Sequence, residues 1–183
     1  CPGTNYNPLF IYGGVGLGKT HLMHAVGNKM LQNNPNCKIL CVSAQNFMND
    51  FTTAVRENTY DQFNNKYHNV DALFIDDVQY LCGDKRQIQN KLFEAFEKLV
   101  PYGKQIIFTS DTYARSLKAM DERLISRFTS GLSVEVEPPE LETRAMILQK
   151  KAMANNFHLP DDVAFFIAKH LKSNVRELEG ALN

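Results

Sequence analysis

The chain has 183 residues, 44% of them hydrophobic, which is enough to bury the core of one domain, or of one domain and part of a second. Twenty Lys and Arg residues balance twenty Asp and Glu residues, which excludes a general electrostatic attraction to nucleic acid or to a membrane surface. The four cysteines form no Cys-x-x-Cys pair and follow no secretory leader, and no apolar run approaches the roughly 20 residues of a membrane span, so we expect a cytoplasmic protein with reduced thiols.

The first predicted elements are a strand at residues 9–12, a glycine-rich loop and a helix that begins near residue 21. The loop has the spacing Gly-x-x-x-x-Gly-Lys-Thr of a phosphate cradle, because glycine alone tolerates the positive φ angles and close backbone approach that a phosphate demands. We expect Lys19 to reach the β- and γ-phosphates of a nucleotide and the Thr20 hydroxyl to bind Mg2+. A glycine-rich turn without a ligand is the alternative. The predicted ATP-binding residues in this stretch are Gly13, Gly14, Gly16, Leu17, Gly18, Lys19, Thr20 and His21.

Further strands are predicted at residues 38–42, 72–76, 105–109 and 132–136, with helical patterns between most of them. Such alternation predicts an α/β fold, in which helices cover both faces of a parallel sheet. Ser43 is a suitable N-cap for a helix at residues 44–56. Phe47, Phe51, Ala54 and Val55 fall on one face of this helix. Tyr60, Phe63 and Tyr67 recur at helical spacing in the next helix, at residues 59–67, and such patterns favour core packing over a ligand site.

Two of the predicted strands end in polar residues. Asp76 and Asp77 close the buried strand at the sheet edge where the phosphate loop also lies, so we expect Asp76 to hold Mg2+ through water. Asp77 is then placed to orient or deprotonate an attacking water. The next strand ends in Thr109-Ser110-Asp111, one of which is a candidate to contact the γ-phosphate or that water. A polar cap to the strand is the alternative.

Arg123 and Arg127 fall one turn apart on the same face of a predicted helix. Arginines so far from a phosphate loop commonly form surface salt bridges. In an ATPase that works as an oligomer, one of them instead contacts the γ-phosphate of a neighbouring subunit, where a rigid charged fork stabilises developing charge.

Pro138-Pro139 ends the last strand, and the pattern beyond it is helical, at residues 140–155, 161–172 and from Asn174 onward. We therefore predict a nucleotide-binding subdomain at residues 1–137 and part of a helical lid at residues 138–183. The chain begins close to a core strand and stops within a helical pattern, so we expect a piece of a longer protein.

Taken together, these residues resemble the AAA+ ATPases, and more narrowly the DnaA family of bacterial replication initiators. The Asp-Asp pair at residues 76 and 77 is similar to that family, whereas most AAA+ proteins carry Asp-Glu there. The resemblance covers essentially the whole chain, in the segments Asn7-Pro8-Leu9-Phe10, Val70-Asp71-Ala72-Leu73, Glu137-Pro138-Pro139-Glu140-Leu141-Glu142-Thr143-Arg144 and Asn174-Val175-Arg176-Glu177-Leu178-Glu179-Gly180-Ala181-Leu182-Asn183.

The resemblance implies an AAA+ P-loop NTPase fold, a three-layer αβα sandwich with a parallel five-stranded sheet followed by part of a helical lid. It assigns the first nucleotide motif to Lys19 and Thr20, and the second to Asp76 and Asp77. The cofactors that it implies are ATP or ADP and Mg2+.

The resemblance also gives roles to residues outside these two motifs. Asp111 resembles the first sensor and Arg176 the second, which would report the γ-phosphate from the lid. Arg127 resembles the finger that acts on a neighbour's ATP. Arg123 resembles an inter-subunit or nucleotide-state contact and is counted among the ATP-binding residues.

A further implication is ATP-dependent homo-oligomers or filaments on origin DNA, in the cytoplasm and nucleoid of a bacterium. Lys85, Arg86 and Lys91 are the candidates for single-stranded DNA, and Arg86 falls where the family has a DNA-contacting arginine. A solvated helix start is the alternative. Thr52 departs from the apolar contact of some relatives. Duplex origin sites and the replicative helicase machinery are expected to bind through regions outside this chain.

Three other functions are weighed against that of a replication initiator that assembles when ATP is bound. A helicase loader or an initiator-related regulator of replication would share the fold without the duplex-reading domain. A small-molecule kinase would give Arg127 no role. A degenerate nucleotide-binding scaffold is disfavoured, since Lys19, Thr20, Asp76 and Asp77 are all present.

Overall fold

The computed structural model describes residues 3, 5–171 and 180 of the chain. The chain divides into two compact units. The larger unit joins Cys1–Tyr12 with Lys19–Glu135, and the smaller joins Gly13–Gly18 with Val136–Asn183.

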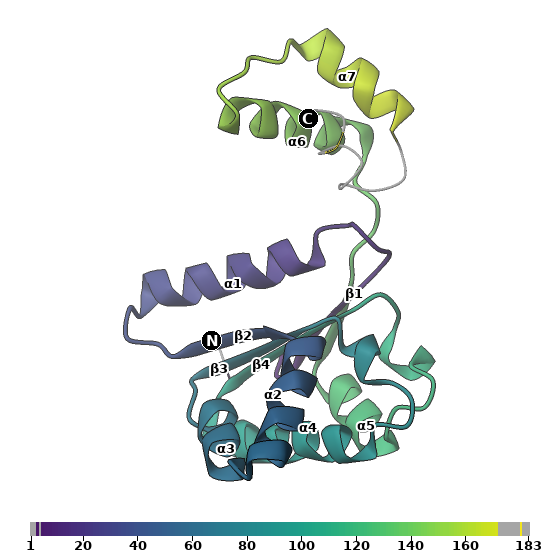
Figure 1. Cartoon of the computed structure of the whole chain (residues 1–183). Coiled ribbons are helices and arrows are strands. Elements are labelled where there is room, and N and C mark those ends of the chain that lie inside the picture. The colour runs from purple at the N-terminus through teal and green to yellow at the C-terminus, as the bar shows by residue number, and fades with distance from the viewer. Residues whose placement is uncertain (1–2, 4, 172–179, 181–183) are drawn as a thin grey trace. The chain divides into compact units, whose positions relative to one another are not determined.

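The larger unit is built on a five-stranded sheet in the order β2-β3-β4-β1-β5, and every neighbouring pair is parallel (Figure 1). This confirms the predicted sheet, with strand ends that agree to within one residue. Because all strands run the same way, their carboxyl ends share one edge. The strands are β1 (Leu9–Tyr12), β2 (Ile39–Ser43), β3 (Ala72–Asp76), β4 (Gln105–Ser110) and β5 (Leu132–Glu135).

Helices cover both faces of this sheet, which confirms the three-layer αβα arrangement. Helix α1 (Lys19–Asn33) covers one face. The opposite face carries α2 (Ala44–Glu57), α3 (Tyr60–His68), α4 (Arg86–Leu99) and α5 (Glu122–Ser130) (Figure 1). Short 3-10 turns lie between them: η1 (Val78–Leu81), η2 (Val100–Tyr102) and η3 (Ala114–Ser116).

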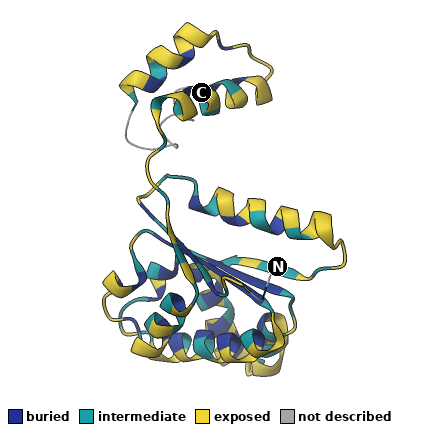
Figure 2. Cartoon of the chain, turned by 180° about the vertical axis from the view of Figure 1, so that it is seen from behind, coloured by how far each residue is buried: buried dark blue, intermediate teal, exposed yellow. Residues whose placement is uncertain are grey.

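The central strands form the core and are coloured dark blue in Figure 2. Every residue of β4 is buried, as expected for a strand with helices on both faces. On the α2 face, the rings of Phe47, Phe63 and Tyr67 pack with centroids 4.7 to 5.4 Å apart, which confirms the core-packing interpretation for these residues. Val55 and Tyr60 shared that predicted pattern, yet their side chains are 43% and 39% exposed.

The structure confirms Ser43 as the N-cap of α2. The Ser43 hydroxyl accepts a hydrogen bond of 3.1 Å from the backbone N–H of Asn46. This bond satisfies one of the N–H groups that the first helical turn leaves without a partner.

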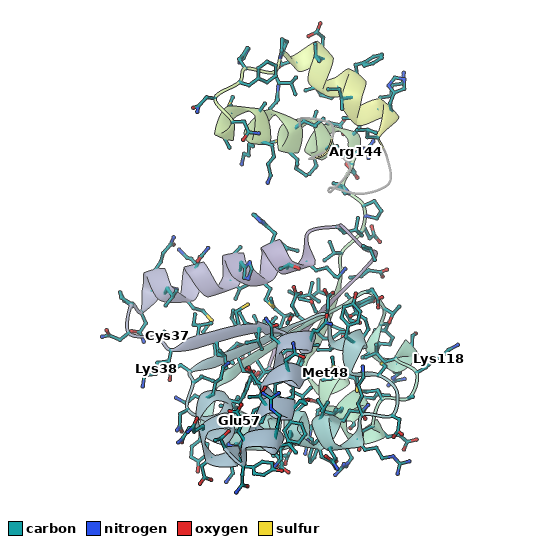
Figure 3. All side chains as sticks on the ribbon, viewed as in Figure 1. Cys37, Lys38, Met48, Glu57, Lys118 and Arg144 are labelled. Carbon is teal, nitrogen blue, oxygen red and sulfur yellow. The ribbon has the colours of Figure 1, made fainter. Side chains whose placement is uncertain are left out.

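The smaller unit contains two packed helices, α6 (Leu141–Ala154) and α7 (Asp161–His170). Small side chains such as Ala145 and Ala168 surround the buried Leu148. Arg144 (Figure 3) donates from Nε to the carbonyl oxygen of Ala168 at 3.0 Å and from Nη1 to that of Pro139 at 2.6 Å. One arginine therefore fixes the end of α7 against the segment that enters α6. The predicted third helix, from Asn174, lies outside the described residues.

Gly27 sets the distance between α1 and the sheet. It is buried, and a Cβ atom at this position would lie 3.1 Å from Cε2 of Phe74 in β3. We expect Gly27→Leu to force α1 away from the sheet and to lower the free energy of unfolding by about 2 kcal/mol, measured by urea denaturation. Asn28→Leu, at the exposed neighbouring position, is the control and should change stability little. Equal stability of the two variants would contradict this view of the packing.

Candidate functional site

The glycine-rich loop connects the end of β1 to the first residue of α1. Gly16 and Gly18 adopt φ angles of 77° and 91°, which residues with a Cβ rarely adopt. A Cβ on Gly13 would lie 2.3 Å from the carbonyl oxygen of Val136. The glycines are therefore required by the backbone of the loop. Lys19, the first residue of α1, is buried at 7% exposure, which is unusual for a lysine and typical of one that binds a specific partner.

At the carboxyl edge of the sheet, Asp76 lies between two threonine hydroxyls. Thr20 Oγ1 donates to Asp76 Oδ2 at 2.8 Å, and Thr109 Oγ1 donates to Asp76 Oδ1. Thr109 is fully buried in β4, the strand next to β3, and its hydroxyl also accepts from the backbone N–H of Asp77 at 2.8 Å. Three elements, α1, β3 and β4, thus meet at one carboxylate.

Asp77 follows β3 with a left-handed φ of 57°, which turns the chain sharply into η1. Its carboxylate accepts a hydrogen bond of 3.1 Å from Gln79 Nε2. Gln79 Oε1 in turn accepts from the backbone N–H of Asp111, at 3.3 Å, where the chain leaves β4. Gln79 therefore ties Asp77 to Asp111, and both lie at the edge where the sequence predicts water and γ-phosphate contacts.

The hydroxyl of Thr20 and the carboxylate of Asp76 are hard oxygen donors of the kind that Mg2+ prefers. Within the described part of the chain, no group of three or more His, Cys, Asp or Glu side chains is placed to hold a metal ion. Mg2+ commonly takes only one or two protein ligands and completes its shell with water and phosphate oxygens. The donor set therefore fits a magnesium ion that arrives with a nucleotide better than a permanent metal centre.

Arg123 and Arg127 both lie over Phe93 of α4, with guanidinium carbons 4.8 and 5.9 Å from the ring centroid. Arg123 is also held by Asp121, the N-cap of α5, at 2.7 Å. Arg127 pairs with Glu97 at 2.8 Å. The two arginines thus share one face, as predicted, and both form ion pairs within the chain.

Lys85 and Arg86 lie at the start of α4 and line a groove of about 470 Å³ against α2. Phe51, Thr52 and Val55 form the α2 side of this groove. The Lys85 ammonium donates to the carbonyl oxygen of Tyr80, while the Thr52 hydroxyl donates to that of Met48 at 2.9 Å. Lys91 is absent from the residues that line the groove and pairs with Glu94 at 2.6 Å.

A second hollow, of about 560 Å³, lies at the opposite, amino-terminal edge of the strands. It is lined by Lys38 (Figure 3), Lys98, Lys104, His68 and Asp71. Helices α3 and α4 end here, and cations stabilise the partial negative charge of helix C-termini. Lys104 pairs with Asp71 at 2.6 Å, and burial lowers the pKa of His68. These residues are explained by the fold, so the carboxyl edge is the better candidate for the functional site.

This arrangement has clear relatives among known proteins. A family model described as "Bacterial DnaA ATPAse domain" matches residues 1–135. The chain belongs to the bacterial DnaA ATPase-domain family.

Individual DnaA proteins support this assignment. The chromosomal replication initiator protein DnaA of Herminiimonas arsenicoxydans is 58% identical over 99% of this chain, and the chain spans 39% of that relative's length. Domain III of the Thermotoga maritima replication initiation protein DnaA superposes with a TM-score of 0.94 at 43% identity, over 99% of this chain and 75% of that one.

Another solved structure, described as the replication initiator DnaA bound to AMPPCP and single-stranded DNA, has a TM-score of 0.87 at 38% identity, over 98% of this chain and 55% of that one. These likenesses confirm the resemblance inferred from the motifs, and they support the replication-initiator interpretation over the helicase loader or regulator.

For this DnaA-family chain, the structure brings some of the predicted site residues together. Thr20 and Asp76 are hydrogen bonded, and Asp77 and Asp111 share Gln79. His21 is exposed in the first turn of α1. Arg176, the predicted second sensor, lies outside the described residues. The individual roles remain predictions.

Gln79, Gln89 and the hydrogen bonds of Thr109 were not identified from the sequence. Thr109 is one of the three candidates for contact with the γ-phosphate or the attacking water, and this stays a prediction; the sequence did not show that its hydroxyl donates to Asp76 and accepts from the backbone N–H of Asp77. Gln89 is 3% exposed; its Nε2 donates to the carbonyl oxygens of Leu81 and Ala119, and its Oε1 accepts from the N–H of Asp121. Neither glutamine belongs to a motif, and no sequence signal marks them.

Two general expectations concern membrane spans and thiols. No helix among the residues described is long and apolar enough to cross a bilayer. Cys37, Cys41 and Cys82 are free thiols. Desolvation is the main cause that raises the pKa of each thiol, which disfavours the reactive thiolate form.

Hydrogen bonds from Arg123 hold the pKa of the Asp121 carboxyl below its usual range. The stability that this interaction contributes is present above the ordinary carboxyl pKa and is lost as the pH falls through the lowered value of the folded state. We expect Arg123→Gln to raise the Asp121 pKa towards its ordinary value, measured by carboxyl-carbon NMR titration. Arg56→Gln, which removes a cation paired with Glu57, should leave that titration unchanged. An unshifted Asp121 in Arg123→Gln would contradict the assignment.

Proposed function

We propose that this chain is the ATP-binding and slowly hydrolysing module of a chromosomal replication initiator, which forms ATP-dependent oligomers on origin DNA and promotes duplex opening. The observation that carries the proposal is the cluster in which Thr20 and Thr109 hold Asp76, with Thr20 directly after the lysine of the phosphate loop. Membership of the DnaA ATPase-domain family supports it.

In this proposal the backbone N–H groups of the loop and the Lys19 ammonium bind the phosphates of ATP or ADP. Thr20 and Asp76 hold Mg2+, which supplies charge neutralisation on the phosphates when bound. The DnaA structure described as bound to AMPPCP supports an ATP-like ligand.

Asp77 orients the attacking water, and Asp111 reports on the γ-phosphate. Both are restrained through Gln79, so their positions depend on each other. Asp77 Oδ1 accepts a hydrogen bond from Gln79, so one of its two carboxylate oxygens is already engaged before water arrives, which suits slow turnover. Slow turnover lets the bound nucleotide act as a switch, with hydrolysis ending the assembled state.

Arg127 contacts the ATP of a neighbouring copy of this chain, which makes assembly depend on the nucleotide. Single-stranded DNA binds in the groove of Lys85 and Arg86, where cations face partly apolar walls from Phe51 and Val55. Duplex origin sites and the replicative helicase machinery bind other regions of a protein longer than this chain. The setting is the cytoplasm and nucleoid of a bacterium.

The nucleotide part of the proposal is tested with Lys19→Ala. Loss of a charged hydrogen-bond donor to phosphate is expected to weaken ATP and ADP binding by roughly 10- to 100-fold, measured by calorimetry with Mg2+ present. Lys29→Ala is a matched control, because Lys29 is exposed on the same helix. Equal affinities in all three proteins would refute nucleotide binding at this loop.

The DNA part is tested with the double variant Lys85→Ala/Arg86→Ala. We expect weaker binding of oligo(dT), and a salt dependence whose logarithmic slope falls by about 0.7 for each phosphate that the variant no longer neutralises. Anisotropy titrations over a range of salt concentrations measure both, and Lys29→Ala again serves as control. An unchanged slope would show that the groove does not bind the DNA backbone.

A further inference from the structure

The two arginines of α5 are held to very different degrees. Arg123 donates from Nε and Nη2 to both carboxylate oxygens of Asp121, at 3.0 and 2.7 Å, and from Nη2 to Asn90 at 2.6 Å. Its guanidinium also lies 4.8 Å from the Phe93 ring. Arg123 therefore has several hydrogen-bond partners, on both α4 and the cap of α5, although its side chain is 55% exposed.

Arg127 is held by fewer contacts than Arg123. Its ion pair with Glu97 of α4 measures 2.8 Å, and the two side chains are 42% and 44% exposed. Its guanidinium carbon lies 5.7 Å from the Phe96 centroid and 5.9 Å from that of Phe93, at the outer limit of a favourable cation–π contact. Arg127 thus rests on a carboxylate and two rings at the surface, where a second molecule has access.

An exposed ion pair of this kind contributes little, because water screens the charges and two long side chains lose freedom. A terminal phosphate carries more negative charge than a carboxylate and matches the planar guanidinium fork. A triphosphate brought to this surface by another protomer can therefore displace Glu97. A diphosphate lacks that terminal group, so with it Arg127 keeps its partner within the chain.

We propose that Glu97 is a positioning residue that pairs with Arg127 within the chain. It competes with the triphosphate bound to a neighbouring copy of this chain for the Arg127 guanidinium. The proposal rests on the proposed function of Arg127 as a contact across an oligomer interface. Glu97 then sets the protein concentration at which the ATP form assembles, because its ion pair has to break before the interface closes.

The test is Glu97→Gln, which removes the charge and keeps the size of the side chain. Assembly is followed by sedimentation velocity over a range of protein concentrations, with Mg2+ and a non-hydrolysable ATP analogue and without DNA. We expect the midpoint concentration to fall by about two- to fivefold, the range that an exposed ion pair allows. With ADP, neither the wild type nor Glu97→Gln should assemble over this concentration range.

Glu94→Gln is the matched control, since Glu94 lies one turn earlier on α4 and pairs with Lys91 at 2.6 Å. It removes the same charge from the same helix without touching Arg127, and it should assemble like the wild type. In an Arg127→Ala background, Glu97→Gln should have no further effect. Unchanged urea midpoints in all variants would exclude altered folding as the cause.

The outcomes separate this proposal from the one on which it rests. If Arg127→Ala assembles like the wild type, or the wild type fails to grow with the ATP analogue, the proposed interface role is wrong and the role of Glu97 falls with it. If Arg127→Ala abolishes assembly but Glu97→Gln behaves as the wild type or assembles less readily, only the competition by Glu97 is refuted.

Discussion

The Thr109 hydroxyl is the contact on which the rest of the candidate site depends. It donates to the carboxylate of Asp76 and accepts from the backbone N–H of Asp77, so a single buried group on β4 orients both acids at the end of β3. Leaving a buried N–H or carboxylate without a partner is costly, and these hydrogen bonds avoid that cost. Thr20 reaches the same carboxylate and thereby joins α1 to the sheet edge.

Two buried or half-buried glutamine amides continue the hydrogen-bond network outward from this edge of the sheet. Gln79 links Asp77 to the end of β4, and Gln89 joins η1 to the loop before α5 and to the N-cap Asp121. Because Asp121 caps the helix that carries Arg123 and Arg127, the arginine face is positioned through hydrogen bonds that begin beside the acids.

Much of the fold was predictable, because alternating apolar runs and helical patterns have one common solution, the parallel sheet covered on both faces. Ser43 and the double proline at 138 and 139 placed element boundaries for local reasons that tertiary packing did not override. Val55 and Tyr60 were harder, because helical spacing identifies a face without showing where the covering layer stops. The partner of Lys91 and the mode of action of Thr109 depend on side chains that no spacing rule relates.

By itself, the sequence determined the phosphate loop, the two acids at the end of β3, the order of strands and helices along the chain, and the family. These features are encoded locally, since they depend on glycine conformation, periodicity and residues close together in the chain. Only the tertiary structure decided that Thr109 positions the acids, that two glutamines tie separate loops together, and that Arg123 has several hydrogen-bond partners while Arg127 rests on Glu97. Most of these contacts join residues about 30 positions apart, such as Thr109 with Asp76 and Gln89 with Asp121, and only the packing of the sheet and its helices brings such residues together.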